Sequence, residues 1–114
     1  MNRVNRKGVK IGYWEFYHSN GDLYSKGSYQ NNRRHGYWEY YWYDGRLDSK
    51  GSFINGEKEG YWEYYHENGN LESNGSYKDG VEDGYWERYR SNGLLRCREL
   101  YKNGIFIETY EEYK

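Results

Sequence analysis

The sequence GYWEYY occurs twice in this chain, at residues 36–41 and again at residues 60–65. Two close variants, GYWEFY at 12–17 and GYWERY at 84–89, extend the series to four copies, each beginning 24 residues after the last. A period between about 20 and 50 residues is typical of stacked supersecondary units, not of one globular core. The sequence therefore predicts a repeat protein.

The 24-residue step divides the chain into four repeats and two end segments. The repeats span 12–35, 36–59, 60–83 and 84–107. Residues 1–11 look like the second half of a degenerate repeat, because Gly8 precedes Asn32 by 24 residues. Residues 108–114 align with the start of a repeat but lack its Gly and Trp, so we expect a capping half repeat there.

Composition and turn signals indicate strands. The chain has 17 Tyr, 5 Trp and 15 Gly but no Ala, which favours strands and tight turns over helices. Each aromatic run is followed by Asn-Gly or Asp-Gly, as in Asn20-Gly21 and Asp44-Gly45, and these pairs predict two-residue hairpin loops with positive φ at both residues. We expect an all-β fold: one elongated antiparallel meander of about nine strands, built from four hairpin repeats.

The predicted loops also fix a register. A two-residue Asn20-Gly21 loop places Trp14 opposite Gly27 and Glu15 opposite Lys26. The same rule pairs Trp38 with Gly51, Trp62 with Gly75 and Glu39 with Lys50, whereas Trp86 meets Glu99. A bulged loop would shift this register by one residue and scramble the pairs. Glycine opposite a Trp lets the ring lie flat on the sheet, so these glycines are expected to be structural.

Strand alternation then separates two faces. The predicted core face carries Trp14, Trp38, Trp62, Trp86, Leu23, Leu47, Leu71, Leu95, Gly27, Gly51 and Gly75. The predicted partner-binding face alternates tyrosine with glutamate and carries Tyr13, Glu15, Tyr37, Glu39, Tyr41, Tyr61, Glu63, Tyr65, Tyr85 and Glu87. No second layer covers the Trp face, so the sheet must curl, form a homodimer or be covered by a partner.

No residue pattern indicates catalysis, a metal or a cofactor. His18 and His66 lie two repeats apart, about 19 Å in a sheet, too far to share a metal, and His35 is expected in a turn. The glutamates of the partner-binding face are expected to be separated by cations, as in a solvated sheet face. We therefore expect a protein that is not an enzyme.

Charge and hydropathy narrow the partners. The net charge is −1, but residues 1–11 carry +4 and residues 60–83 carry −5. Nucleic-acid binders usually present a continuous basic face, so nucleic acid is not expected, whereas an acidic middle favours docking to another protein. Without an apolar run of about 18 residues or a signal-peptide centre, we expect a cytoplasmic protein and no membrane span.

The repeat also resembles a known family. The third copy, with Gly60, Trp62, Tyr65, Asn68-Gly69-Asn70-Leu71, Gly75 and Tyr77, resembles the MORN-repeat variant of bacterial YwqK-like proteins, often labelled antitoxin components of toxin and antitoxin modules. The resemblance covers residues 12–107 and implies a partner that is another protein, such as a toxin. The chain departs from that pattern at Tyr13, Tyr37, Tyr61 and Tyr85, at Asn32 and at Glu99.

Two functions are therefore open at this point. The first is a protein-binding module of antitoxin or immunity type, which masks a basic target with its Tyr and Glu face. The alternative is a structural or membrane-surface adaptor that binds anionic lipid through residues 1–11 and through Arg88, Arg90, Arg96 and Arg98.

Overall fold

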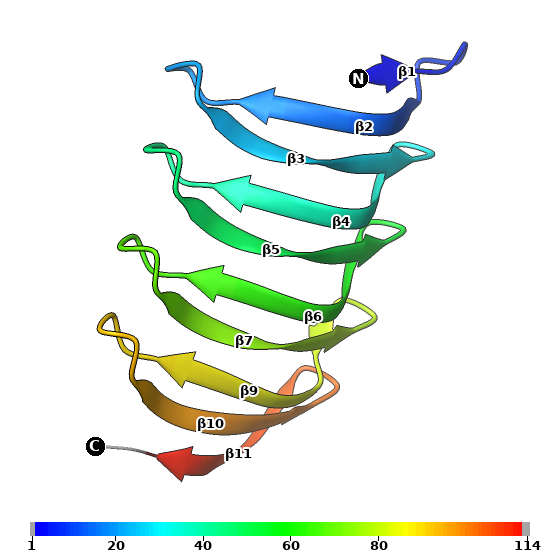
Figure 1. Cartoon of the computed structure of the whole chain (residues 1–114). Coiled ribbons are helices and arrows are strands. Elements are labelled where there is room, and N and C mark those ends of the chain that lie inside the picture. The colour runs from blue at the N-terminus through cyan, green and yellow to red at the C-terminus, as the bar shows by residue number, and fades with distance from the viewer. Residues whose placement is uncertain (1, 113–114) are drawn as a thin grey trace.

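The computed structural model describes residues 2–112, which form one open β-sheet without a covering layer (Figure 1). Neighbours follow chain order from β1 to β7 and then β9, β10 and β11, every pair is antiparallel, and β8 pairs with β7. This confirms the predicted all-β meander. The strands are β1 (Arg3–Val4), β2 (Lys10–Tyr17), β3 (Leu23–Gln30), β4 (Arg33–Tyr41), β5 (Leu47–Ile54), β6 (Glu57–Tyr65), β7 (Leu71–Lys78), β8 (Val81–Glu82), β9 (Gly84–Tyr89), β10 (Leu95–Lys102) and β11 (Ile105–Glu112).

Residues 2–112 form eleven strands, two more than the expected nine. The two additional strands, β1 and β8, have only two residues each. Strand β11 takes the place of the predicted capping half repeat, of which Tyr113 and Lys114 lie outside the described residues. The principal extents of 54 × 32 × 15 Å are those of a long, one-layer ribbon.

The predicted register holds through the middle of all four hairpins. Trp14 lies opposite Gly27, and the cross-strand pairs Trp38–Gly51, Trp62–Gly75 and Trp86–Glu99 repeat the arrangement. The ring that lies on each glycine is nevertheless that of the next repeat, Trp38 on Gly27, Trp62 on Gly51 and Trp86 on Gly75, so the expected contact of Trp and Gly within one hairpin is wrong. The turns between hairpins are two-residue loops: at Asn55-Gly56, φ is 49° and 87°, the left-handed values that a type I′ turn requires.

The loops within the hairpins differ from the prediction. Only Gly21 of the Asn20-Gly21 pair has positive φ, 94°. The amide of Gly21 donates to the carbonyl of His18, and the amide of His18 donates to the carbonyl of Asp22. These bonds define a three-residue loop closed by a glycine bulge, so the two-residue loop predicted here is wrong. The later hairpins repeat this geometry.

A second bulge restores the register, and it moves the leucines to the other face. Tyr24 is an extra residue between the pairs Tyr17–Leu23 and Phe16–Ser25. Residues directly opposite one another share a face, so Leu23 lies on the side of Tyr17 and not with the tryptophans. The leucines predicted for the core are therefore half-buried on the partner-binding side, at Leu23, Leu47, Leu71 and Leu95.

The long strands bend toward the Trp side. Lys58 and Tyr64 belong to the same strand, six residues apart, which would separate their Cα atoms by about 20 Å in a straight strand. Their side chains nevertheless meet, because the Lys58 ammonium donates to the Tyr64 hydroxyl at 2.8 Å. Gly60, with φ of 75°, lies between them at a break in the strand register. The sheet is thus curled, and its inner side carries the tryptophans.

The core is a continuous row of aromatic rings along this inner side. Trp38, Trp62 and Trp86 are only 1–2% exposed, whereas Trp14 at the end of the row is half-buried. Tyrosine and phenylalanine rings alternate with them at centroid distances of 5.1–6.3 Å, mostly edge to face. Each buried Trp also donates its indole N–H to a serine carbonyl of the preceding strand, as Trp62 does to Ser52 at 2.9 Å.

Candidate functional site

The outer side of the sheet gathers all the residues predicted to bind a partner. Because side chains alternate along a strand, each aromatic run directs its first Tyr, its Glu and its last Tyr to this side. We call this surface the Tyr–Glu face. It comprises Tyr13, Glu15, Tyr17, Tyr37, Glu39, Tyr41, Tyr61, Glu63, Tyr65, Tyr85, Glu87 and Tyr89.

Each glutamate of the first three repeats is held by two tyrosines of its own strand. Glu39 accepts hydrogen bonds from Tyr37 at 2.7 Å and from Tyr41 at 2.5 Å. Glu63 accepts the equivalent bonds from Tyr61 and Tyr65 at 3.0 and 2.8 Å. The carboxylates therefore lie below the hydroxyls, while the Tyr37 and Tyr61 rings remain more than half exposed.

The glutamates also form a charge ladder with residues of the intervening strands. Lys26 binds Glu39 and Lys50 binds Glu63, each with 3.4 Å between ammonium and carboxylate. At the C-terminal end, Arg98 binds Glu87 at 2.9 Å. These contacts leave a face of exposed tyrosine rings supported by carboxylates that already have partners.

The same contacts shift the pKa values of the face. Hydrogen bonds from Tyr17 and Tyr13 hold the pKa of Glu15 below its usual value. Burial acts to raise the pKa of Glu39, but the bonds from Tyr41, Tyr37 and Lys26 outweigh it and lower that pKa. Burial first, and the glutamate bond second, raise the pKa of Tyr13 and of Tyr61 to about 12.

We expect folding stability to be lost at both ends of the pH scale. A lowered carboxyl pKa contributes stability above its unfolded value of about 4.3, and that contribution disappears as pH falls through the folded pKa. A raised tyrosine pKa contributes stability below about 10, which is lost as pH rises through the folded pKa. Ultraviolet difference absorbance of the native protein should show tyrosine ionisation with a midpoint well above that of the urea-unfolded chain. Coinciding midpoints would contradict the Tyr–Glu bonds.

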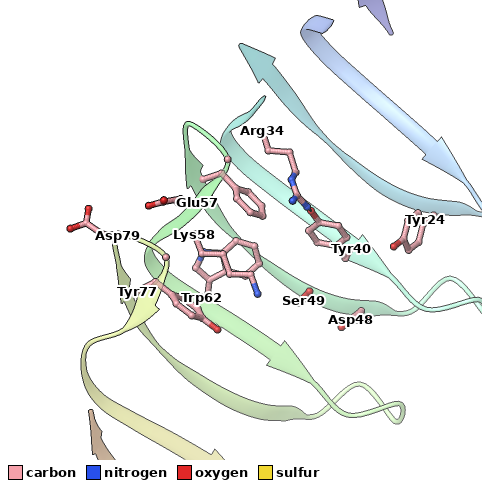
Figure 2. A pocket seen from close by; sticks show the side chains of 13 residues that line it. Tyr24, Arg34, Tyr40, Asp48, Ser49, Glu57, Lys58, Trp62, Tyr77 and Asp79 are labelled. Atoms are coloured by element: carbon pink, nitrogen blue, oxygen red, sulfur yellow. The ribbon is translucent and has the colours of Figure 1, made fainter. Parts of the chain in front are cut away.

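The inner side contains a groove of about 640 Å³ that is lined by residues of the first three repeats and that we call the Trp groove (Figure 2). Trp62 and Tyr77 form part of its lining, and Lys58 lies with its ammonium 4.9 Å from the Trp62 centroid and 5.2 Å from that of Tyr77. Arg34 covers Phe53 at 4.6 Å and donates to the Tyr40 hydroxyl. Aromatic faces thus stabilise two cations inside the bend.

Acidic side chains give the Trp groove a mixed charge. Asp48, Glu57 and Asp79 line it together with Arg34 and Lys58. Burial raises the pKa of Asp48, and burial followed by the charge of Arg34 lowers the pKa of Lys58. The groove therefore offers no uniform charge to a ligand.

Sequence reasoning missed both groove cations. A straight strand would keep Arg34 and Lys58 far from Tyr40 and Tyr64, so nothing in the alternation pattern indicated contact. A signal was nonetheless present, because Lys10, Arg34 and Lys58 recur at the 24-residue step.

The histidines and the cysteine have structural contacts. Contrary to the prediction, His35 lies within β4, where its Nδ1 accepts the amide of Asn55 at 3.3 Å. His18 and His66 each lie with Nε2 near a carbonyl of the next repeat, at 3.2 and 2.9 Å. Cys97 is a free, buried thiol in the column that holds serine in the first three repeats.

Within residues 2–112 no group of His, Cys, Asp and Glu has metal-binding geometry, and no helix could span a bilayer.

The repeats match a known family. The MORN repeat variant matches residues 10–31, 34–55 and 58–79, which are more than half of the chain. The chain belongs to this family. MORN repeats are generally protein- or lipid-binding modules. The matched residues end before the fourth copy, in which Arg88, Cys97 and Glu99 replace the ring, serine and glycine of the other three. Comparison with curated proteins gives no match.

Proposed function

We propose that this MORN-repeat chain is a non-enzymatic protein-binding module that masks a basic surface of another protein, in the manner of an antitoxin or immunity protein. The observation that carries the proposal is the row of exposed Tyr13, Tyr37, Tyr61 and Tyr85 rings above a ladder of carboxylates.

Tyrosine suits this role because it offers a large contact area at a small cost in side-chain entropy. The hydrogen bonds to Glu39 and Glu63 fix the rings before a partner arrives, which reduces that cost further. The acidic charge of residues 60–83 would attract a basic partner and accelerate its association. Masking needs buried area and complementary charge, and a rigid sheet face supplies both.

The test begins with affinity capture of the tagged chain from an extract of its native host, followed by purification of the retained protein. Changing Glu39, Glu63 and Tyr61 together to Ala should weaken calorimetric binding of that protein by about 100-fold or more. The matched control changes Asp48 to Asn and Glu57 to Gln, which removes two negative charges from the Trp groove. Unaltered affinity in the triple variant, or an equal loss in the control, would contradict the Tyr–Glu face.

The alternative function, an adaptor for anionic lipid, has weaker support from the arrangement of its basic residues. Arg88 lies over Trp86 on the inner side and is paired with Glu99, whereas Arg98 is paired with Glu87 on the outer side. Cations on opposite faces do not form the plane that a bilayer surface requires. Sedimentation of the chain with phosphatidylserine vesicles at low salt, abolished by changing the basic residues of 1–11, would favour the adaptor instead.

A further inference from the structure

The charge ladder has one rung without a cation. In each repeat, one residue of the second strand lies between the glutamates of the two neighbouring strands. This residue is Lys26 in the first repeat, Lys50 in the second and Arg98 in the fourth. In the third repeat it is Asn74, which lies opposite Glu63 on one side and Glu87 on the other. Two carboxylates therefore face a neutral residue here.

A cavity accompanies the missing cation. A hollow of about 400 Å³ opens on the Tyr–Glu face above Asn74 and Ser76, between Tyr61 and Tyr85, and its lining also includes Glu87, Arg98 and Tyr110. We call it the Asn74 slot. Tyr61 and Tyr85 are more than half exposed, whereas Asn74 at the floor of the slot is only 9% exposed. In the first two repeats the long lysine side chain occupies the equivalent position and reaches the glutamate of the next strand.

The walls of the slot suit an ammonium group. Tyr61 and Tyr85 lie on the strands either side of β7, which are about 10 Å apart, twice the strand spacing, so an alkyl chain can enter between them. Tyrosine rings attract a cation above their faces. Arg98 of β10 also lines the slot and binds Glu87, while Asn74 of β7 lies opposite Glu87 on the other side. An incoming ammonium would therefore be the second cation beside Glu87, as Lys26 and Lys50 are beside Glu39.

We propose that the Asn74 slot receives a lysine side chain from the basic partner. The chain's own Lys26 and Lys50 show which side chain fits the equivalent positions and which glutamate it contacts. The incoming lysine would complete the ladder by placing its ammonium beside Glu87, with its alkyl chain between the two tyrosine rings. This inference rests on the proposed function and names the residue type that the Tyr–Glu face recognises.

The direct test is an NMR titration of the isotope-labelled chain with a short peptide of alternating lysine and glycine at low salt. Amide shifts should concentrate at Asn74, Ser76 and Glu87. The same peptide with every lysine acetylated should produce none of these shifts, because acetylation removes the charge.

Reciprocal variants separate the slot from general attraction between opposite charges. Asn74→Lys fills the slot from within and should weaken peptide binding by about tenfold or more. Ser91→Lys adds the same charge at an exposed turn and should change the affinity little. Lys50→Asn should open a second slot between Tyr37 and Tyr61, with new shifts at Ser52. Asn74→Ser keeps the slot open and should preserve binding.

The outcomes distinguish this inference from the proposed function. Peptide binding that is equal in the wild type, Asn74→Lys and Ser91→Lys, with no new shifts in Lys50→Asn, would overturn the lysine slot. If the Glu39, Glu63 and Tyr61 triple variant nevertheless failed to bind the captured partner, the Tyr–Glu face would remain the binding surface, but without a lysine slot. Unchanged partner affinity in the triple variant would overturn the proposed function itself. Absence of any shift in the wild type would overturn the inference as well.

Discussion

Gly51→Ala should lower the free energy of unfolding by about 3 kcal/mol, although it adds a single methyl group. A Cβ built on Gly51 would lie within 3.0 Å of three ring carbons of Trp62, which rests on the glycine backbone. The ring would have to leave its place in the aromatic row, where it already packs against Phe53, Tyr64 and Tyr77. Urea unfolding followed by tryptophan fluorescence measures the loss.

A double-mutant cycle provides the control for this prediction. Gly51 does not have positive φ, so alanine is normally preferred there by about 0.5–1 kcal/mol. Once Trp62 is Ala, Gly51→Ala should therefore be neutral or stabilising. A loss of similar size in both backgrounds would show that the strand backbone, not the ring, requires glycine. Ser52→Ala, at the next residue, should change stability by less than about 0.5 kcal/mol.

Trp62→Ala should cost about 3–5 kcal/mol, the usual range for removing a buried large aromatic side chain. Trp62 is 1% exposed, contacts Phe53, Tyr64 and Tyr77, and supplies the hydrogen bond to the Ser52 carbonyl. Lys58 would also lose one of the three rings over which it lies. Since small domains are stable by only about 5–15 kcal/mol, the midpoint in urea should fall sharply.

Trp14→Ala is the matched comparison. Trp14 has the same sequence context but is half-buried at the end of the aromatic row, so its removal should cost clearly less. The loss of stability in Trp62→Phe should lie between those of Trp14→Ala and Trp62→Ala, because phenylalanine keeps a ring but loses the indole hydrogen bond. Equal losses for Trp14→Ala and Trp62→Ala would mean that the row does not act as a core whose centre is more constrained than its ends.

The sequence was sufficient to predict the meander and the register of the strand centres, but not the three-residue loops within the hairpins. Three local facts reinforced one another: the turn glycines, Trp opposite Gly, and Glu opposite Lys, as in Trp38–Gly51 and Glu39–Lys50. The face of the leucines could not be obtained in this way. The bulge at Gly21 shifts the pairing by one residue and the bulge at Tyr24 shifts it back. The strand centres are therefore paired as if neither bulge were present.

The bend and the Trp groove were also beyond the sequence pattern. Both depend on left-handed glycines such as Gly36 and Gly60, whose φ is not evident from a Gly-x-Trp motif. The Tyr–Glu face, in contrast, follows from alternation alone. The runs Tyr37–Tyr41 and Tyr61–Tyr65 each pair with the next strand without a bulge until their last residue, so the alternation of side chains is not interrupted. The Asn74 slot could not be predicted from the sequence. Asparagine in place of lysine leaves a cavity only where the neighbouring side chains do not fill the space.

The one-layer architecture has a mechanical consequence. The chain enters the sheet at one end of the strand order and leaves it at the other, so tension applied between the ends pulls neighbouring strands apart along their hydrogen bonds (Figure 1). In that direction the bonds break one after another instead of sharing the load. The ribbon would unzip from an end, one hairpin at a time, and each 24-residue repeat would release about 80 Å of extended chain. A partner lying across several repeats would bridge these hairpins and act as a mechanical clamp.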